Sequence, residues 1–180
     1  AASPNDLRIG ELHVCGIFGF IGPDDLDSTS AKTLVKHAQQ RGRDSSGMVI
    51  HDTTYHAYRA DYPIGWLLKR IPPLGNLFFG HSRLVTNGTG DNQPVSREQV
   101  IVLHNGIVVN HEAIWPILGK TPELEIDTEI IPAIIASHLE SGGSVETAAE
   151  RVLSLTEGVV ACAALIPRLG KLLLFSNNGS

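Results

Sequence analysis

Short apolar runs and amphipathic stretches follow one another along this chain in a definite order. Residues 15–21 (CGIFGFI) form an apolar run with two glycines, which is typical of a buried strand that another backbone approaches closely. Residues 28–40 place apolar side chains on one stripe at helical spacing, which predicts a helix that ends at Gly42. The chain therefore begins its ordered part with a strand and a helix.

The same patterns continue to the end of the sequence. Further strands are predicted at 46–51, 54–60, 76–85, 100–104, 158–166 and 171–175, and further helices at 126–139 and 144–155. Residues 86–97 form a polar, turn-rich loop between two of the strands. Because strands and helices are segregated rather than alternating, the pattern favours antiparallel sheets with helices packed outside them over a doubly wound parallel sheet.

Composition restricts the class of protein. Of the 180 residues, 42% are hydrophobic and 18% are charged, which indicates a globular domain rather than a disordered chain. A formal net charge of −5 makes a basic nucleic-acid or membrane surface a poor expectation. The longest apolar run, 159–166, is far shorter than the roughly 20 residues of a membrane span. We expect a single soluble, cytoplasmic domain without nucleic-acid or membrane partners.

Candidate chemistry is concentrated in a few motifs. These are CGIFGFIG at 15–22, RGRDSSG at 41–47, HSRLVTNG at 81–88 and HNGIVVNHEAI at 104–114, followed by Asp127-Thr128-Glu129. Each is weak alone, since an Arg-Gly pair often ends a helix and an Asn-Gly pair often makes a turn. Their order and spacing carry the information.

Taken together, from Cys15 onward, these motifs resemble the class II glutamine amidotransferase domain, an N-terminal-nucleophile hydrolase. RGRDSSG, HNGIVVNHE and IDTEII are similar to the glutaminase domain of glucosamine-fructose-6-phosphate synthase. Asn92-Gln93-Pro94 and the residues before Cys15 are more similar to amidophosphoribosyltransferase. The resemblance implies an α+β fold, a four-layer αββα sandwich of two antiparallel sheets between helix layers.

The resemblance makes Cys15 the nucleophile, which attacks the side-chain amide carbon of glutamine and forms a thioester. In this family the α-amino group of the cysteine itself is the base, so Cys15 must be the first residue of the mature chain. The alternative for a cysteine in such a run is core packing, and this is the interpretation for Cys162 within VVACAALI. Two cysteines form neither a disulfide framework nor a metal knuckle.

The resemblance also assigns the other catalytic residues. Asn105 and Gly106 would form the oxyanion hole, through a side-chain amide and a backbone N–H. The alternative for this pair is a tight turn after a strand, which would itself present an N–H. Arg41 and Gly42 match family positions beside the nucleophile, with a helix end as the alternative for Gly42.

Substrate-binding residues follow in the same way. Arg83 would clamp the α-carboxylate of L-glutamine, with Thr86 beside it, and Asp127 would take the α-ammonium group, although Asp127 is also a good helix N-cap. Asn87 stands where the sugar-aminating members carry histidine, and Leu84 stands where an aromatic residue is usual. At these two positions, which the resemblance places at the rim of the glutamine pocket, the sequence differs from the family.

Two histidines within the motifs have a separate interpretation. His81 and His104 are expected to be hydrogen-bonded structural residues rather than metal ligands. No metal and no cofactor is expected.

These assignments lead to a domain division and a function. Residues 1–14 are expected to be a leader or propeptide removed at Val14-Cys15. Residues 15–180 are expected to be the glutaminase domain, either truncated at its C-terminus or a trimmed stand-alone domain. The domain would release ammonia for an acceptor domain or partner chain. Two alternatives stay open: an inactive structural or binding protein in which the leader blocks Cys15, and an amidase acting on another amide, which the pairing of Arg83 with Asp127 disfavours.

Overall fold

The computed structural model describes residues 15–83 and 92–177. The first half of the chain forms one sheet and two helices: β1 (Gly16–Ile21), α1 (Ser28–Gln39), β2 (Ser45–His51), β3 (Tyr55–Ala60), α2 (Ile64–Leu67) and β4 (Leu77–Arg83). The second half forms β5 (Val95–Arg97), β6 (Val100–Val108), α3 (His111–Leu118), the 3-10 helix η1 (Asp127–Glu129), α4 (Ile130–Glu140), α5 (Val145–Leu155), β7 (Gly158–Ile166), the 3-10 helix η2 (Pro167–Leu169) and β8 (Lys171–Ser176).

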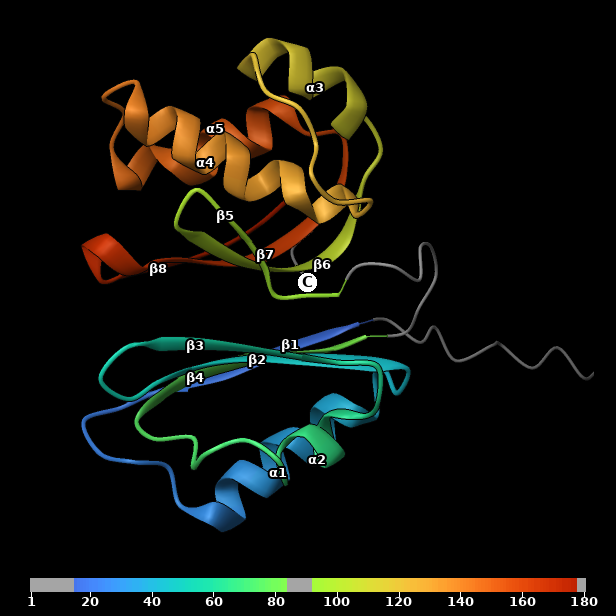
Figure 1. Cartoon of the computed structure of the whole chain (residues 1–180), viewed down its shortest axis with the longest axis vertical. Helices are drawn as coiled ribbons and strands as arrows, with labels where there is room; N and C mark the ends of the chain where they lie inside the picture. The colour runs from blue at the N-terminus through green and yellow to red at the C-terminus, as the bar shows by residue number, and fades with distance from the viewer. Residues whose placement is uncertain (1–14, 84–91, 178–180) are drawn as a thin grey trace, which may run out of the picture.

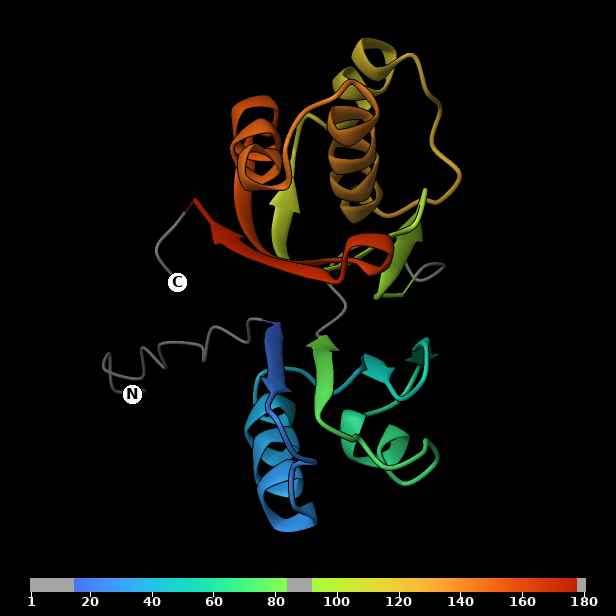
Figure 2. The ribbon, with the colours of Figure 1, turned by 90° about the vertical axis from the view of Figure 1, so that its left-hand side faces the viewer.

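The two sheets lie face to face between two helix layers (Figure 1). The first sheet has the order β1-β4-β2-β3 and the second the order β5-β6-β7-β8, and all recorded pairings are antiparallel. Helices α1 and α2 cover the outer face of the first sheet, whereas α3, α4 and α5 cover the outer face of the second (Figure 2). The α+β sandwich expected from the sequence is confirmed.

Helix α1 carries the chain from the end of β1 back to its beginning. Asp27 caps its N-terminus, because the carboxylate accepts the backbone N–H groups of Thr29 and Ser30 at 3.0 Å each. The helix ends at Gln39 with its C-cap at Gln40, two residues before Gly42. The next residues, Arg41 and Gly42, therefore lie beside the first residues of β1.

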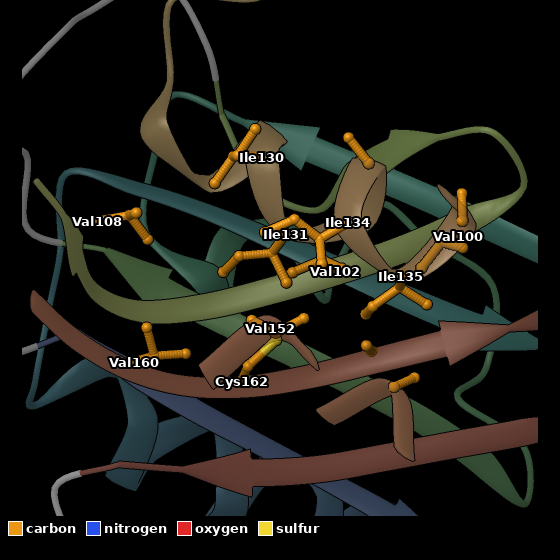
Figure 3. Close-up of a cluster of buried hydrophobic side chains, with 14 of the residues drawn as sticks. Val100, Val102, Val108, Ile130, Ile131, Ile134, Ile135, Val152, Val160 and Cys162 are labelled. Carbon is orange, nitrogen blue, oxygen red and sulfur yellow. The ribbon is translucent and has the colours of Figure 1, made fainter. Parts of the chain in front are cut away.

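Three apolar clusters hold the layers together. The largest lies between α3–α5 and the second sheet, where Ile131, Ile134 and Ile135 of α4 pack onto β6 and β7 (Figure 3). Cys162 of β7 is buried within it, and burial raises the pKa of its thiol, as expected for a core cysteine. A second cluster lies under α1 and α2. The third joins the two sheets and consists of Val49, Phe79, Ile101, Leu103, Ala163 and Leu165.

Several elements differ from the sequence prediction. Strand β6 continues through Asn105 and Gly106, which pair with Ala161 and Val160 of β7, so the tight-turn alternative for this Asn-Gly pair is wrong. The predicted helix at 126–139 begins as η1 rather than as an α-helix. Helices α2 and α3 and the short strand β5 had not been predicted.

No helix in the described ranges is long and apolar enough to cross a membrane.

Candidate active site

A cavity of about 380 Å³ lies where the beginning of β1 and the end of β4 approach the end of β6. Its walls come from parts of the chain that are distant in sequence. The lining residues are Cys15, Arg83, Gln93, His104, Gly106, Ile107, Val108, Val109, His111, Glu125, Ile126, Asp127 and Thr128. The structure thus brings together four of the predicted site residues: Cys15, Arg83, Gly106 and Asp127.

Cys15 lies immediately before β1 and is partly buried. Two residues later, Ile17 packs against the apolar cluster between the sheets. Because side chains alternate along an extended chain, Cys15 is expected on the same side, facing the second sheet. That direction agrees with its place in the cavity wall.

Arg41 and Gly42 flank the residue that follows Cys15. The Cδ of Arg41 lies 3.1 Å from the point where a Cβ on Gly16 would stand, so the arginine stem rests on a glycine that leaves room for it. Gly42 is buried, and its carbonyl accepts the hydroxyl of Ser82 at 2.7 Å, while Ser82 pairs with Gly16 across the sheet. Both predicted residues therefore lie next to the start of β1 without belonging to the described cavity wall.

Arg83 is the last residue of β4 and is buried to all but 8% of its surface. It lies opposite Ser45 of β2, and its carbonyl accepts the N–H of Asp44 at 3.0 Å. Two residues earlier on the same face, His81 is fully buried, and burial, together with the charge of Arg83, lowers its pKa to about 3. Arg83 of the cavity wall therefore lies near a buried, neutral histidine.

Gly106 has a backbone conformation that an L side chain rarely adopts, with φ of 148°. A Cβ at this position would overlap the carbonyl oxygen of Val159 in β7, so only glycine fits. Asn105 is half-buried, and strand alternation puts it on the face that Leu103 turns toward the first sheet. Gly106 lines the cavity, whereas Asn105 is not part of the described lining.

Asp127 is the first residue of η1, one position after the N-cap residue Ile126. Its Oδ2 accepts the backbone N–H of Val108 at 2.7 Å, which fastens η1 to the end of β6. The carboxylate thus accepts a hydrogen bond from β6 across the cavity wall, and the helix N-cap alternative for Asp127 is wrong, since the N-cap residue is Ile126.

Three polar residues of the wall were not among the catalytic or substrate-binding residues predicted from the sequence: Gln93, His104 and Thr128. All three are buried and hydrogen-bonded to one another. His104 had been expected to be a hydrogen-bonded structural residue, which is confirmed. Gln93 and Thr128 could have been found from the sequence through their positions in the Asn-Gln-Pro and Asp-Thr-Glu motifs.

Several predictions lie outside the described residues. These are the leader at 1–14, the substrate contacts Thr86 and Asn87, and the departure at Leu84. Within the described ranges, no group of three or more His, Cys, Asp or Glu side chains could hold a metal ion.

Comparisons with known proteins give similarities over nearly the whole chain. No protein-family model matches it. The chain is 31% identical to the glutamine–fructose-6-phosphate aminotransferase (isomerizing) of Bartonella henselae over 176 residues, which are 92% of this chain and 29% of that protein. The enzyme of the same name from Zymomonas mobilis is also 31% identical, over 93% of this chain and 29% of its own length. The chain therefore spans about three tenths of the length of these relatives.

A solved structure has the same fold. Glutamine phosphoribosylpyrophosphate amidotransferase from B. subtilis, complexed with ADP and GMP, superposes with a TM-score of 0.66 over 91% of this chain and 37% of that one, at 22% identity. At this identity the likeness concerns the fold. Together, the sequence similarity and the αββα architecture identify the chain as a member of the class II glutamine amidotransferase domains.

Proposed function

We propose that this domain hydrolyses the side-chain amide of L-glutamine through a thioester on Cys15 and releases ammonia for an acceptor. The observation that carries the proposal is the shared cavity, in which a cysteine, a buried arginine, a glycine at the end of β6 and a carboxylate come together. An arginine and a carboxylate in one cavity complement the two charged ends of a free α-amino acid.

Substrate recognition follows from this pair of charges. The guanidinium of Arg83 can bind the α-carboxylate through two parallel N–H donors, which a lysine cannot do. Asp127 offers its carboxylate to the α-ammonium group. We expect Thr86 and Asn87 to add contacts beside Arg83.

The first chemical step is acyl transfer to sulfur. The α-amino group of Cys15 takes the thiol proton, and Sγ attacks the amide carbon of glutamine. Such an amine titrates at about 7.7–8.0, so it can accept and return a proton near neutral pH. The negative oxygen of the tetrahedral intermediate would be bound by the side-chain amide of Asn105 and the backbone N–H of Gly106. The proton then passes to the leaving nitrogen, and ammonia departs.

The second step is hydrolysis of the thioester. The α-amino group deprotonates a water molecule, which attacks the thioester carbonyl, and the same two donors stabilise the new oxyanion. Glutamate leaves and the thiol is restored. One base and one oxyanion hole thus serve both half-reactions.

This mechanism requires a free amine on Cys15. While Val14 is attached, the nitrogen of Cys15 is an amide and cannot act as a base. We therefore propose that residues 1–14 are removed before activity. The Cys15 thiol could itself attack the Val14 carbonyl and break the peptide C–N bond, giving a thioester that water opens.

An acceptor completes the function. The relatives are named aminotransferases and are more than three times as long as the matched region. We propose that ammonia is consumed by an acceptor domain or by a partner chain of corresponding function.

The proposal is tested by comparing a chain that begins at Cys15 with one that retains residues 1–14. Ammonia and glutamate release from glutamine are measured for both, and for Cys15→Ala and Cys162→Ala in the shorter form. We expect activity in the shorter wild type and in Cys162→Ala, whose thiol is buried in the core. We expect none in Cys15→Ala or in the chain with residues 1–14 attached.

Two results would count against the proposal. Full activity with residues 1–14 still attached would refute the α-amine mechanism. Inactivity of a folded shorter chain would instead favour an inactive binding or structural protein with this fold.

A further inference from the structure

His104 lies at the centre of a buried hydrogen-bond network beside the cavity. Only 2% of its surface is exposed. Its Nε2 lies 3.1 Å from the carbonyl oxygen of Val159, and its Nδ1 lies 3.2 Å from the hydroxyl of Thr128. Both ring nitrogens are therefore committed to partners on other elements.

The partners determine where the ring proton lies. A carbonyl oxygen only accepts, so Nε2 must carry the hydrogen and donate it to Val159. Nδ1 is then an acceptor, and Thr128 donates its hydroxyl hydrogen to it. Burial lowers the pKa of His104, which keeps the imidazole in this neutral form.

Gln93 completes the network without leaving a conflict. Its Nε2 donates to the hydroxyl of Thr128 at 3.2 Å and to the carbonyl of His104 at 2.8 Å. Its Oε1 accepts the backbone N–H of His104 at 2.6 Å. Each donor faces an acceptor, so the donor and acceptor roles allow a single pattern of hydrogen bonds in this network.

One end of this network lies against Gly106. The Nε2 of His104 is 2.9 Å from the point where a Cβ on Gly106 would stand, and the carbonyl of Val159, its hydrogen-bond acceptor, crowds the same point. The imidazole and this carbonyl thus enclose the Gly106 backbone, whose unusual φ depends on the fit.

The other end of the network reaches Asp127. Thr128 is the next residue in η1, and Asp127 is fastened to β6 through the N–H of Val108 at 2.7 Å. A displacement of Thr128 would therefore move Asp127 against the end of β6.

We infer that His104 is a positioning residue that holds the Asn105–Gly106 backbone and, through Thr128, Asp127 in one fixed arrangement. The inference rests on the proposed glutaminase function. In that reaction, the oxyanion donors and the carboxylate for the substrate ammonium would be aligned by a single neutral imidazole that does not itself touch the substrate's reacting atoms.

The test uses Thr128→Val, which keeps the shape of the side chain but cannot donate to Nδ1, and Thr128→Ser, which can. Thr156→Val is the matched control, since Thr156 is also buried and its hydroxyl donates to the Val152 carbonyl at 3.0 Å, at the C-terminal end of α5. All are made in the chain that begins at Cys15.

We expect Thr128→Val to lower kcat/KM for glutamine about 10- to 100-fold, because the buried Nδ1 of His104 loses its donor and the arrangement around it shifts. Both a lower kcat and a higher KM are expected, because the oxyanion donors and the ammonium carboxylate both move. Thr128→Ser should recover most of the activity, and Thr156→Val should keep wild-type kinetics at a temperature where every variant is folded. Wild-type kinetics in Thr128→Val would overturn the inference.

A second measurement does not depend on turnover. In nitrogen-15 NMR spectra, His104 should show the neutral tautomer protonated at Nε2, and the backbone amide resonances of Gly106 and Asp127 should shift in Thr128→Val but not in Thr156→Val. Unshifted resonances in Thr128→Val would overturn the positioning role, even where the wild type releases ammonia normally. An inactive wild type with these shifts present would instead count against the proposed function alone.

Discussion

At the scale of single residues, the region between the sheets contains polar atoms that the fold leaves unpaired. The Nε2 of His81 and the hydroxyl of Ser45 are buried, and neither has a hydrogen-bond partner among the described residues. His81 had been expected to be fully hydrogen-bonded, and at Nε2 this is wrong. A neutral imidazole tolerates such a place better than an imidazolium, because burial penalises the charged form most.

The decrease in the free energy of unfolding at acid pH should therefore depend on His81. Its pKa is lowered from 6.5 to about 3 in the folded chain. Between these two values the unfolded chain binds more protons than the folded chain, so the free energy of unfolding falls as pH drops below about 6.5 and continues to fall until about 3. His81→Leu should make this dependence shallower, and urea unfolding at pH 7.5 and pH 5 measures it.

His104 keeps part of the dependence in that variant, because burial also lowers its pKa. The control is His37→Gln, an exposed histidine of α1, which should retain the wild-type difference between the two pH values. An equal pH dependence in His81→Leu and in wild type would contradict the assignment.

What could be predicted at this scale was the set of residues that the motifs name. Cys15, Arg83, Gly106 and Asp127 were predicted as site residues, and all four line one cavity. The role of Gln93 could not be predicted in the same way. It arises from contacts with residues 11 and 35 positions away, and nothing local in the sequence indicates them.

At the scale of elements, the connection between α3 and η1 forms part of the cavity wall and is held by a buried ion pair. The Glu129 side chain, only 2% exposed, pairs with Arg97 of β5. Its carboxylate also accepts the backbone N–H groups of Glu123 and Leu124, at 3.1 and 3.0 Å. The guanidinium of Arg97 lies 4.8 Å over the Trp115 ring of α3. The segment is thus held at the point where it turns toward the cavity.

Glu129→Gln should loosen this segment. An amide has one accepting oxygen and no charge, so it cannot satisfy Arg97 and two N–H groups together, and we expect a loss of about 1.5–3 kcal/mol in the free energy of unfolding. Hydrogen exchange at the Glu123 and Leu124 amides should become faster. Glu140→Gln is the control, because Glu140 is exposed and its 3.5 Å pair with Lys120 of the same segment is worth about 0–1 kcal/mol. Equal exchange in the two variants would contradict this role for Glu129.

Helices and strands were predicted accurately where the apolar pattern extends over many residues. They were missed where the pattern is short or is interrupted. The strand and helix around residues 16–39 and the strand pair at the end of the chain are close to the predicted positions. Helix α3 begins inside a motif interpreted as site chemistry and contains Pro116, whereas α2 has only four residues. Strand β6 is longer than predicted because Gly106 allows pairing with β7 to continue past Asn105.

At the scale of the whole molecule, the cavity exists because the two sheets meet. Arg83 belongs to the first sheet, which Cys15 directly precedes, and His104 and Gly106 belong to the second. The sequence could predict two antiparallel sheets, but not which strand ends adjoin. That depends on contacts such as the one at Gly47 of β2, where a Cβ would overlap the carbonyl of Gln93, so only glycine lets this segment approach the first sheet.

The apolar contact between the sheets should therefore control the site in a way that the outer core does not. Leu165 of β7 is buried in the cluster between the sheets, whereas Ile135 of α4 is buried in the cluster on the outer face of the second sheet. Replacing either by alanine should cost about 2–5 kcal/mol of stability. Only Leu165→Ala removes contact between the layers, so it should alter how Cys15 and Arg83 face Gly106.

The measurement is glutamine hydrolysis by both variants in the chain that begins at Cys15, at a temperature where both are folded. We expect Leu165→Ala to raise KM and lower kcat, since both sheets supply groups to the proposed reaction, while Ile135→Ala stays near the wild type. Leu165 lies near the far end of β7 from Ala161, which pairs with Asn105, so a direct contact with the site does not explain a loss. Equal kinetics in the two variants would mean that the cavity keeps its geometry without the apolar contact, and that the hydrogen bonds around Gln93 and His104 hold the sheets in place at this end.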